Sequence, residues 1–199
     1  MLQISDLHFG YPQQAPVFQD WSARLAPGLS VLCGDESSGK TTLLRLLAGE
    51  LHGRGAVSLD GAPLAPGQVF WQDPRAAPDD TVASAYLLAQ AQRWPAWDEA
   101  AAQAHIDGLS LREHIGKPFF ALSTGGRRKV WLTAALASGA VLTLIDEPMA
   151  GLDTPSIRYL LAAMDGAARQ VPPRWLLVAH WEPLPGVPAE HTLALRQPA

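Results

Sequence analysis

The sequence predicts an α/β fold with a parallel sheet at its centre, and three observations favour it. A short apolar run at residues 29–33 is followed by a glycine-containing loop and by residues 41–48, whose leucines recur at helical spacing. Residues 141–145 are almost wholly apolar, which is typical of strands that a parallel sheet buries on both faces. From residue 125 to residue 179, helical and strand-like patterns alternate, as in proteins whose helices cover a parallel sheet.

Length and composition favour one folded domain without a general attraction to polyanions. The chain has 199 residues, of which 48% are hydrophobic and 17% charged, and this composition argues against disorder and coiled coils. Fifteen Lys and Arg residues stand against nineteen Asp and Glu residues, which gives a formal net charge of −4. Because this balance does not draw nucleic acid or anionic lipid to the whole surface, any anion site must be local.

The expected location is the cytosol. The first residues lack the basic and apolar regions of a signal peptide, and Cys33 has no second cysteine with which to form an internal disulfide. The most apolar stretch, residues 131–145, is shorter than the roughly 20 residues that span a bilayer, and Ser138 and Gly139 interrupt it. We therefore expect a reduced protein without a membrane anchor of its own.

The N-terminal third predicts an antiparallel sheet ahead of the parallel one. Residues 2–5 and 17–19 alternate between apolar and polar side chains on either side of a turn at residues 10–12. Two more short strands are expected at residues 56–60 and 69–71, around a turn at residues 61–63.

Residues 74–118 have a different character and predict a small helical insert. They are rich in Ala and amphipathic, with helices expected at residues 81–94 and 97–106 and with Asp80 or Thr81 as the first N-cap. After the insert we expect helix 125–137, strand 141–145, helix 156–169 and strand 175–179. A proline-rich stretch at residues 182–188 marks an irregular connection near the end.

The loop after the first apolar run matches a phosphate-binding motif. Residues 34–41, Gly-Asp-Glu-Ser-Ser-Gly-Lys-Thr, fit G-x-x-x-x-G-K-[ST] in full and lie between a predicted strand and a predicted helix. In such a loop the backbone N–H groups attract phosphate, Lys40 reaches the β- and γ-phosphates, and Thr41 can bind Mg²⁺. Asp35 and Glu36 run against an anion site, and the pattern does not explain them. The motif predicts a P-loop NTPase.

Two acidic residues follow the second buried strand. Asp146 and Glu147 come directly after residues 141–145, at the carboxyl end where the ligands of open α/β sheets gather. We expect Asp146 to hold Mg²⁺, directly or through water, and Glu147 to orient and deprotonate an attacking water. Together with the loop, this pair predicts hydrolysis of a nucleotide.

Five further segments follow in the order found in ATP-binding cassette (ABC) ATPases, and the chain resembles that family over essentially its whole length. Residues 122–130, Leu-Ser-Thr-Gly-Gly-Arg-Arg-Lys-Val, are similar to the signature segment of the family, Leu-Ser-Gly-Gly-Gln with a basic continuation. Gln72 matches the glutamine loop, and Tyr11 matches the aromatic residue that stacks on adenine. Residues 151–153 match the loop after the catalytic acid, and His180 matches the switch histidine.

The resemblance implies a RecA-like core with an N-terminal antiparallel β-subdomain at residues 1–73 and 119–199 and a helical subdomain at residues 74–118. It implies ATP and Mg²⁺ as ligands, with catalytic roles for Lys40, Gln72, Glu147 and His180. The nucleotide-binding set that it implies is Tyr11, Gly34, Ser37, Ser38, Gly39, Lys40, Thr41, Thr42, Ser123 and Gly125. The implied metal set is Thr41, Gln72 and Asp146.

The resemblance also implies a head-to-tail dimer, of identical or different chains, in which two ATP molecules each lie between one chain's Lys40 loop and the other's Ser123 loop. The sequence departs from the family pattern at Thr124 and Gly126, which replace a glycine and the glutamine, so the effect of the segment on turnover is open. The cations at residues 127–129 are expected to form a solvated helix face rather than a nucleic-acid site.

The leading interpretation is the energy-coupling subunit of an ABC transporter, acting on a separate membrane permease at the inner face of the cell membrane. In that case the helical insert receives the permease, with Trp94, Pro95 and Trp97 as docking residues unless they pack in the core. One alternative is a soluble ABC ATPase that acts on the ribosome or on nucleic acid. Another is a small P-loop kinase, against which the signature segment, Gln72 and His180 argue. The transported substrate and the direction of transport are not legible in this sequence.

Overall fold

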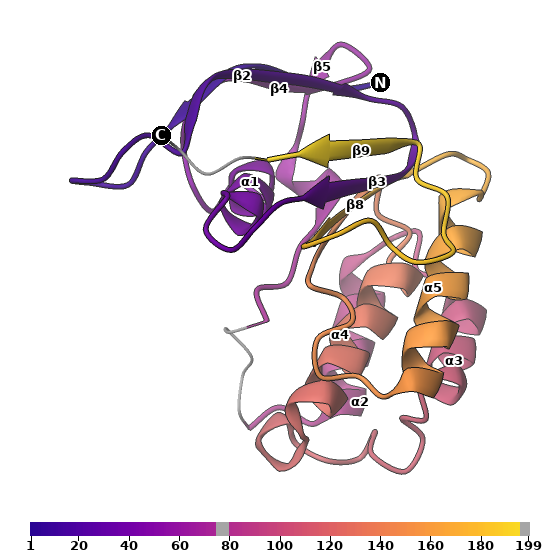
Figure 1. Cartoon of the computed structure of the whole chain (residues 1–199). Helices are drawn as coiled ribbons and strands as arrows, with labels where there is room; N and C mark the ends of the chain where they lie inside the picture. Colours follow the sequence, from indigo (N-terminus) through magenta and orange to yellow (C-terminus); the bar gives the residue numbers. More distant parts are fainter. Residues whose placement is uncertain (75–79, 196–199) are drawn as a thin grey trace.

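The computed structural model describes residues 1–74 and 80–195 and contains two sheets with helices between and beside them (Figure 1). One sheet is antiparallel, with the strand order β2-β1-β4-β5. The other is parallel, with the order β6-β7-β8-β3-β9. The α/β class expected from the sequence is confirmed.

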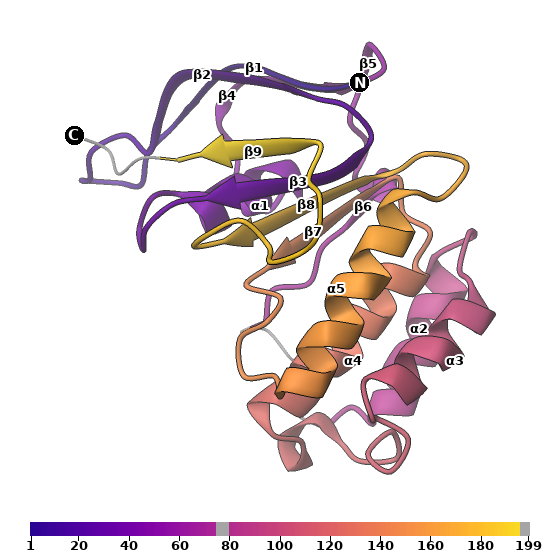
Figure 2. The same cartoon turned by 45° about the vertical axis from the view of Figure 1, so that its right-hand side comes forward.

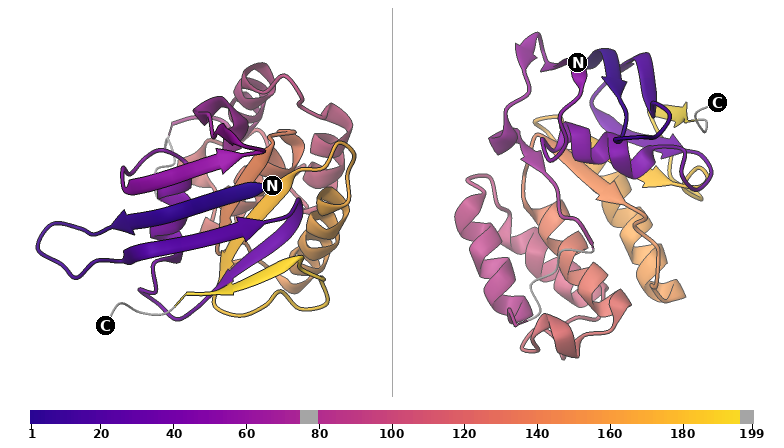
Figure 3. Two further views of the ribbon diagram at one scale, coloured as in Figure 1. Left: turned by 90° about the horizontal axis from the view of Figure 1, so that it is seen from above. Right: turned by 90° about the vertical axis from the view of Figure 1, so that its left-hand side faces the viewer.

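The antiparallel sheet comes from the N-terminal part of the chain and is seen from above in Figure 3. Its strands are β1 (Leu2–Phe9), β2 (Phe18–Leu25), β4 (Arg54–Leu59) and β5 (Ala62–Pro63). Along β1 the side chains of Leu2 and Ile4 are buried because alternate residues of a strand face the same side, and the irregularity between Ile4 and Leu7, where Asp6 has a φ angle of 51°, brings Leu7 to the buried side. Both expected opening strands are therefore present, each longer than the sequence pattern suggested.

The parallel sheet brings together segments from the whole chain. Its strands are β3 (Gly28–Cys33), β6 (Val69–Phe70), β7 (Leu142–Asp146), β8 (Trp175–His180) and β9 (His191–Ala194). Every residue of β3 and β8 is buried, as expected for central strands covered on both faces.

Two of these strands correct the sequence-based expectation. The turn expected at residues 61–63 lies at residues 60–61, where it joins β4 to the two-residue β5. The strand expected at residues 69–71 leaves that hairpin and pairs with β7 of the other sheet. Strand β9 was not expected at all. It is a short edge strand whose side chains are half-exposed or exposed, so it carries little of the hydrophobic signal on which sequence prediction depends.

Helix α1 (Lys40–Leu47) lies between the two sheets (Figures 1 and 3). Leu43, Leu44 and Leu47 are buried in one hydrophobic cluster with β1 residues on one side and Leu144 of β7 on the other. The N-terminus of the helix is fixed against the carboxyl ends of the parallel strands by this packing.

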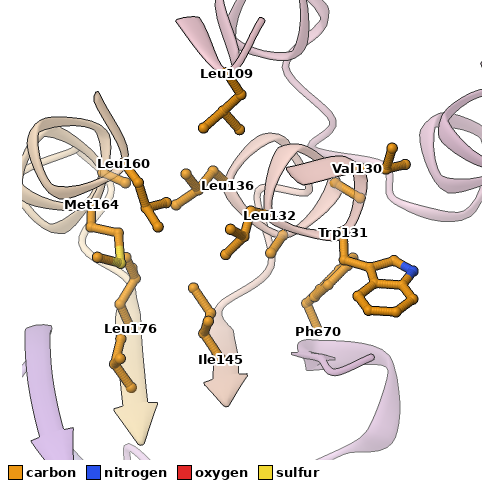
Figure 4. Packing of buried hydrophobic residues seen from close by; sticks show 14 of the residues in the cluster. Phe70, Leu109, Val130, Trp131, Leu132, Leu136, Ile145, Leu160, Met164 and Leu176 are labelled. Carbon is orange, nitrogen blue, oxygen red and sulfur yellow. The ribbon is translucent and has the colours of Figure 1, made fainter. Parts of the chain in front are cut away.

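The remaining helices cover the opposite face of the parallel sheet (Figure 2). Helices α4 (Thr124–Ala137) and α5 (Thr154–Ala168) lie against the strands, and α2 (Ala83–Arg93) and α3 (Glu99–Gly108) pack outside α4. Leu132 of α4 faces Ile145 of β7, and Met164 of α5 faces Leu176 of β8 (Figure 4). Two short 3₁₀ turns, Pro66–Gln68 and Phe119–Ala121, precede β6 and α4.

The helical segment departs from its expected details at its first helix. Neither Asp80 nor Thr81 caps α2, because its N-cap residue is Val82 and no side chain accepts a hydrogen bond there. The N–H groups of Ala83 and Ser84 instead donate to the carbonyls of Lys117 and Ile115, which satisfies the helix start from a neighbouring loop. The beginning of the expected insert, residues 75–79, lies outside the described residues.

Trp94, one of the expected docking residues, is a core residue. It is 5% exposed, and its ring lies 5.6 Å from that of Phe70 in a tilted arrangement. Trp97 is partly buried, and its indole N–H donates to a Glu99 carboxylate oxygen at 3.0 Å. The helical segment and the parallel sheet thus share one hydrophobic cluster.

Candidate active site

The loop at residues 34–41 connects β3 to α1 and takes the backbone conformations that its small residues allow. The φ angles of Gly34, Ser37 and Gly39 are all positive, at 156°, 63° and 94°. A Cβ atom on Gly39 would lie 2.7 Å from a methyl carbon of Val17, and one on Gly34 would collide with the Leu195 carbonyl. Glycine is therefore required at both ends by conformation and by space.

Lys40 is held inside this loop. Its ammonium group donates to the carbonyl oxygens of Gly34 at 2.6 Å and Asp35 at 2.8 Å, and the residue is 8% exposed. The cationic charge is thereby fixed at the centre of the loop, beside the N-terminus of α1. Burial raises the pKa of the Cys33 thiol just before the loop, an effect that the Lys40 charge partly offsets.

Thr41 and Asp146 meet although 105 residues separate them. The Thr41 hydroxyl donates to the Asp146 carboxylate at 2.8 Å, which joins the first turn of α1 to the end of β7. The hydroxyl oxygen of Ser38 is buried nearby without a hydrogen-bond partner in the described part of the chain. One hydroxyl and one carboxylate fit Mg²⁺, which completes its ligand shell with waters and substrate phosphates. A cluster of three or more His, Cys, Asp or Glu side chains is not found among residues 1–74 and 80–195.

Glu147 stands at a sharp bend after β7. Its φ angle is +47°, which is uncommon for a residue with a side chain, and its N–H donates to the Ala179 carbonyl of β8 at 2.9 Å. His180, at the end of β8, places Nε2 3.9 Å from a Glu147 carboxylate oxygen. The Nδ1 atom of His180 lies 2.9 Å from the Glu182 carbonyl oxygen, a contact that needs the proton on Nδ1. The two residues therefore share one edge of the sheet.

A cavity of about 850 Å³ unites most of the expected site residues. It is lined by Tyr11, Gln14, Ala15, Val17, Glu36, Ser37, Ser38, Gly39, Lys40, Thr41, Thr42, Asp146, Glu147 and Trp181. At its rim the Tyr11 hydroxyl lies 3.3 Å from the Thr42 hydroxyl, and the Tyr11 ring meets Phe9 edge-on at 5.0 Å. The cavity volume and the aromatic rim suit a nucleotide.

Gln72 lies apart from this cavity. Its side-chain oxygen accepts a hydrogen bond from the Tyr86 hydroxyl of α2 at 3.2 Å, and burial raises the pKa of Tyr86 far above its usual range. Gln72 lines a separate hollow of about 30 Å³ together with Arg128 and Asp146. The glutamine thus reaches the back of the Asp146 turn and links it to the helical segment.

Ser123 and Gly125 also lie outside the cavity, at the start of α4. The Ser123 side chain is the N-cap and accepts a hydrogen bond from the Gly126 N–H at 3.0 Å, so its own hydroxyl proton stays available to another acceptor. Gly125 packs against the Gly151 carbonyl so closely that a Cβ atom would collide with it. The signature segment is therefore braced against the loop that follows Glu147.

Sequence reasoning missed two residues near the site. Trp181 follows His180, lines the cavity and is 64% exposed. Arg128 was expected on a solvated face, but its Nη1 atom donates to the backbone carbonyls of Asp146, at 2.9 Å, and Glu147. Lys129 is likewise engaged, in an ion pair of 2.7 Å with Asp153. These cations face the protein because α4 runs across the end of β7. A local charge pattern carries no information about that packing.

Comparison with known sequences also points to a nucleotide-binding protein. Residues 18–150 match the family described as ABC transporter. The chain is 35% identical over 162 residues to a taurine import ATP-binding protein of Pseudomonas entomophila, an alignment that covers 77% of this chain and 62% of the relative. It is 34% identical to a molybdenum import ATP-binding protein of Hahella chejuensis, with 77% of this chain and 46% of the relative covered. The chain thus spans about half to three-fifths of the length of these relatives.

Structural comparison agrees on the fold. A solved structure from Pyrococcus furiosus, described as an ABC transporter ATP-binding protein, superposes with a TM-score of 0.80 at 20% identity, covering 98% of this chain and 96% of that one. In the described part of the chain, the helices are too short or too polar to cross a membrane. With a family match over two-thirds of its length and a Lys40 loop joined to Asp146, this chain belongs to the ABC transporter family, in the fold of its ATP-binding domains.

Proposed function

We propose that the protein is the ATP-hydrolysing, energy-coupling subunit of an ABC transporter. The observation that carries this proposal is the contact between Thr41 and Asp146 at the floor of a nucleotide-sized cavity, with Glu147 as the next residue. A phosphate loop alone would fit many P-loop proteins. A carboxylate positioned beside that loop, followed by a second acid facing the same cavity, fits hydrolysis of the terminal phosphate.

The residues of the cavity have different roles, which follow from their chemistry. Lys40 and the amides at the start of α1 bind the phosphates, because they concentrate positive potential at one end of the cavity. At the rim of the cavity, Tyr11 offers an aromatic face on which the nucleobase can stack, and Thr42 contacts the Tyr11 hydroxyl. Glu147 acts as the base toward water, and His180 lies beside it at the end of β8, with Nε2 3.9 Å from a Glu147 carboxylate oxygen. Gly34, Ser37, Ser38 and Gly39 shape the loop around the phosphates.

Mg²⁺ fits the Thr41 hydroxyl and the Asp146 carboxylate, and Gln72 stands behind Asp146 as a third candidate. When bound there, the ion neutralises charge on the β- and γ-phosphates. The protein's own part is to keep the Thr41 and Asp146 oxygens 2.8 Å apart before the nucleotide arrives.

We further propose a head-to-tail dimer with a second ABC ATPase subunit. Ser123 is exposed and has an available hydroxyl proton, and it stands at the N-terminus of a 14-residue helix, which attracts phosphate. Since Ser123 does not line this chain's own cavity, its acceptor would be a nucleotide held by a partner subunit. Gly125 keeps the segment close to Gly151 in that interface.

The partner on the membrane side is proposed to be an integral-membrane permease, with residues 74–118 as the helical subdomain that it contacts. The similarity to two import ATP-binding proteins supports this role. The chain would then lie at the inner face of the cell membrane and associate with it through the permease. We propose no direct contact with nucleic acid, in keeping with the net charge of −4.

ATPase assays of two variants test the proposed activity. Glu147→Gln should lower kcat for ATP hydrolysis by about 10²- to 10⁴-fold, as expected for loss of a general base, while ATP still binds. Lys40→Ala should weaken ATP binding itself, because a phosphate ligand is removed. Turnover is measured by phosphate release without any acceptor substrate, and affinity by equilibrium dialysis.

The matched control is Glu113→Gln, which makes the same chemical change at an exposed position outside the cavity and should leave turnover within about twofold. Unchanged turnover in Glu147→Gln would contradict the proposed base. For the partner, affinity purification of tagged Glu147→Gln from solubilised membranes with ATP and Mg²⁺ should recover a multi-span membrane protein. Recovery of ribosomes or nucleic acid instead would favour the soluble ABC ATPase.

A further inference from the structure

Arg128 lies behind the turn at Asp146 and Glu147, where it lines the small hollow together with Gln72 and Asp146. It lies in the second turn of α4, and its Nη1 atom donates to two successive backbone carbonyls, those of Asp146 and Glu147. Its Nε atom is buried and has no hydrogen-bond partner within residues 1–74 and 80–195. The guanidinium is therefore committed to the turn between β7 and the proposed base.

Charge and burial agree with this assignment. Burial lowers the pKa of Arg128, and the nearby carboxylates of Asp146 and Glu147 act in the opposite direction. Arginine stays charged even so, because its ordinary pKa is above 12. The cation therefore holds the two backbone carbonyls and also places positive charge close to both carboxylates.

The turn held by Arg128 needs support. Glu147 has a φ angle of +47°, a conformation that costs about 1–3 kcal/mol unless the surroundings impose it. Its N–H is fixed by the Ala179 carbonyl of β8, and its C=O by Arg128 and by the Ala150 N–H at 3.2 Å. Without Arg128, one of the two anchors from outside the turn is lost and the carboxylate can shift.

We propose that Arg128 is a positioning residue for ATP hydrolysis, which fixes the direction of the Glu147 carboxylate by holding its backbone from α4. This inference rests on the proposed function of the site. Because α4 begins at Ser123, the same helix that presents the signature segment to a partner also holds this chain's own base.

Three variants of Arg128 test the proposal in the full chain. Arg128→Met keeps the length and removes the donors, and it should lower kcat about 10- to 100-fold, as expected when a reacting group moves by about 1 Å. The Kd for Mg–ATP should change less than about threefold, since the phosphate loop is untouched. Arg128→Lys, which keeps the charge and a donor, should recover part of kcat, and Arg128→Gln, which keeps a neutral donor, should recover less.

The matched control is Arg169→Met, because Arg169 is paired only with Asp165 at 2.9 Å among the described residues and lies at the far end of α5. It should keep wild-type kcat. A kcat of Arg128→Met within twofold of wild type overturns the proposal, and so does a kcat loss that Arg128→Lys does not relieve. If Arg128→Met fails to fold by thermal melting, Arg128→Gln decides by the same criteria. Absence of turnover in the wild-type protein would instead contradict the proposed function, and the role of Arg128 would fall with it.

Discussion

Two neighbouring glycines in the signature segment differ in what surrounds them. A Cβ atom on Gly125 would collide with the backbone carbonyl of Gly151, whereas one on Gly126 would lie 3.3 Å from the side-chain oxygen of Ser123. Both residues lie in α4, where alanine is ordinarily favoured over glycine by about 0.5–1 kcal/mol. The same substitution should therefore change stability by very different amounts at these adjacent positions.

Gly125→Ala should destabilise the protein by about 1–3 kcal/mol, because either α4 or the loop after Glu147 must move to accept the methyl group. Gly126→Ala should stay within about 1 kcal/mol of wild type, since helix propensity and slight crowding oppose each other. Urea unfolding of both variants measures the difference. Equal stabilities would show that the contact between Gly125 and Gly151 is not close in solution.

At the scale of single residues, the sequence predicts the positions of site residues that belong to a contiguous motif. Gly34 to Thr41 can be identified because strand, loop and helix follow one another in the chain, and the structure places them as expected. The partners of Gln72 and Arg128 could not be predicted, because Tyr86 and Asp146 reach them only through the packing of α2 and α4. Charge runs such as residues 127–129 indicate exposure on average, and a helix crossing a strand end overrides that average.

Among the elements, α5 has a start that depends on pH. Its N-cap Asp153 accepts a hydrogen bond from the Ser156 N–H at 2.9 Å and pairs with Lys129 of α4. The hydrogen bond from Lys129 holds the pKa of Asp153 well below its usual range. The ionised form is favoured by folding, so the stabilisation is complete above the unfolded pKa of about 3.9 and is lost as the pH falls from there through the folded value.

Asp153→Ala should therefore cost about 1 kcal/mol of stability near pH 7, mainly through the lost cap. The difference in unfolding free energy between Asp153→Ala and wild type should narrow as the pH falls from about 5 to about 3, because Asp153 begins to be protonated in the unfolded chain over this range. Asp153→Asn keeps a capping oxygen and should lose less. Chemical denaturation across this pH range provides the measurement, and a gap independent of pH would contradict the role of the ionised pair.

Sequence prediction at the element scale succeeded where hydrophobic patterns were long. Helices α4 and α5 and strands β7 and β8 begin and end within two residues of their expected positions. The strand at residues 69–71 was predicted but placed in the wrong sheet, and β9 was missed, since an exposed edge strand gives no periodic signal. The cap of α2 was also missed, because carbonyls from residues 115 and 117 replace the capping side chain.

For the whole molecule, a head-to-tail arrangement predicts complementation between two defective chains. Lys40→Ala removes the side chain with which a chain binds the phosphates of its own nucleotide. Ser123→Arg blocks the contact that a chain makes with the nucleotide of its partner. Each variant alone should be inactive, but a mixture forms some dimers in which an intact Lys40 loop faces an intact Ser123. Partial recovery of ATP hydrolysis on mixing is the expected result. Failure to recover would contradict a dimer of identical chains and favour a different partner subunit.

The strand order of the parallel sheet also determines at what stage of synthesis the chain can bind ATP. Strand β3, which carries the phosphate loop, lies between β8 and β9, and these strands come from residues 175–180 and 191–194. Translation of the intervening residues takes on the order of ten seconds, and long-range pairing of this kind is slow to form. The loop motif is thus made well before the two strands that flank β3, and the sheet around it cannot form until residue 194 has been translated. A chain truncated before residue 175 should therefore retain no ATP, which equilibrium dialysis of the truncated protein can check.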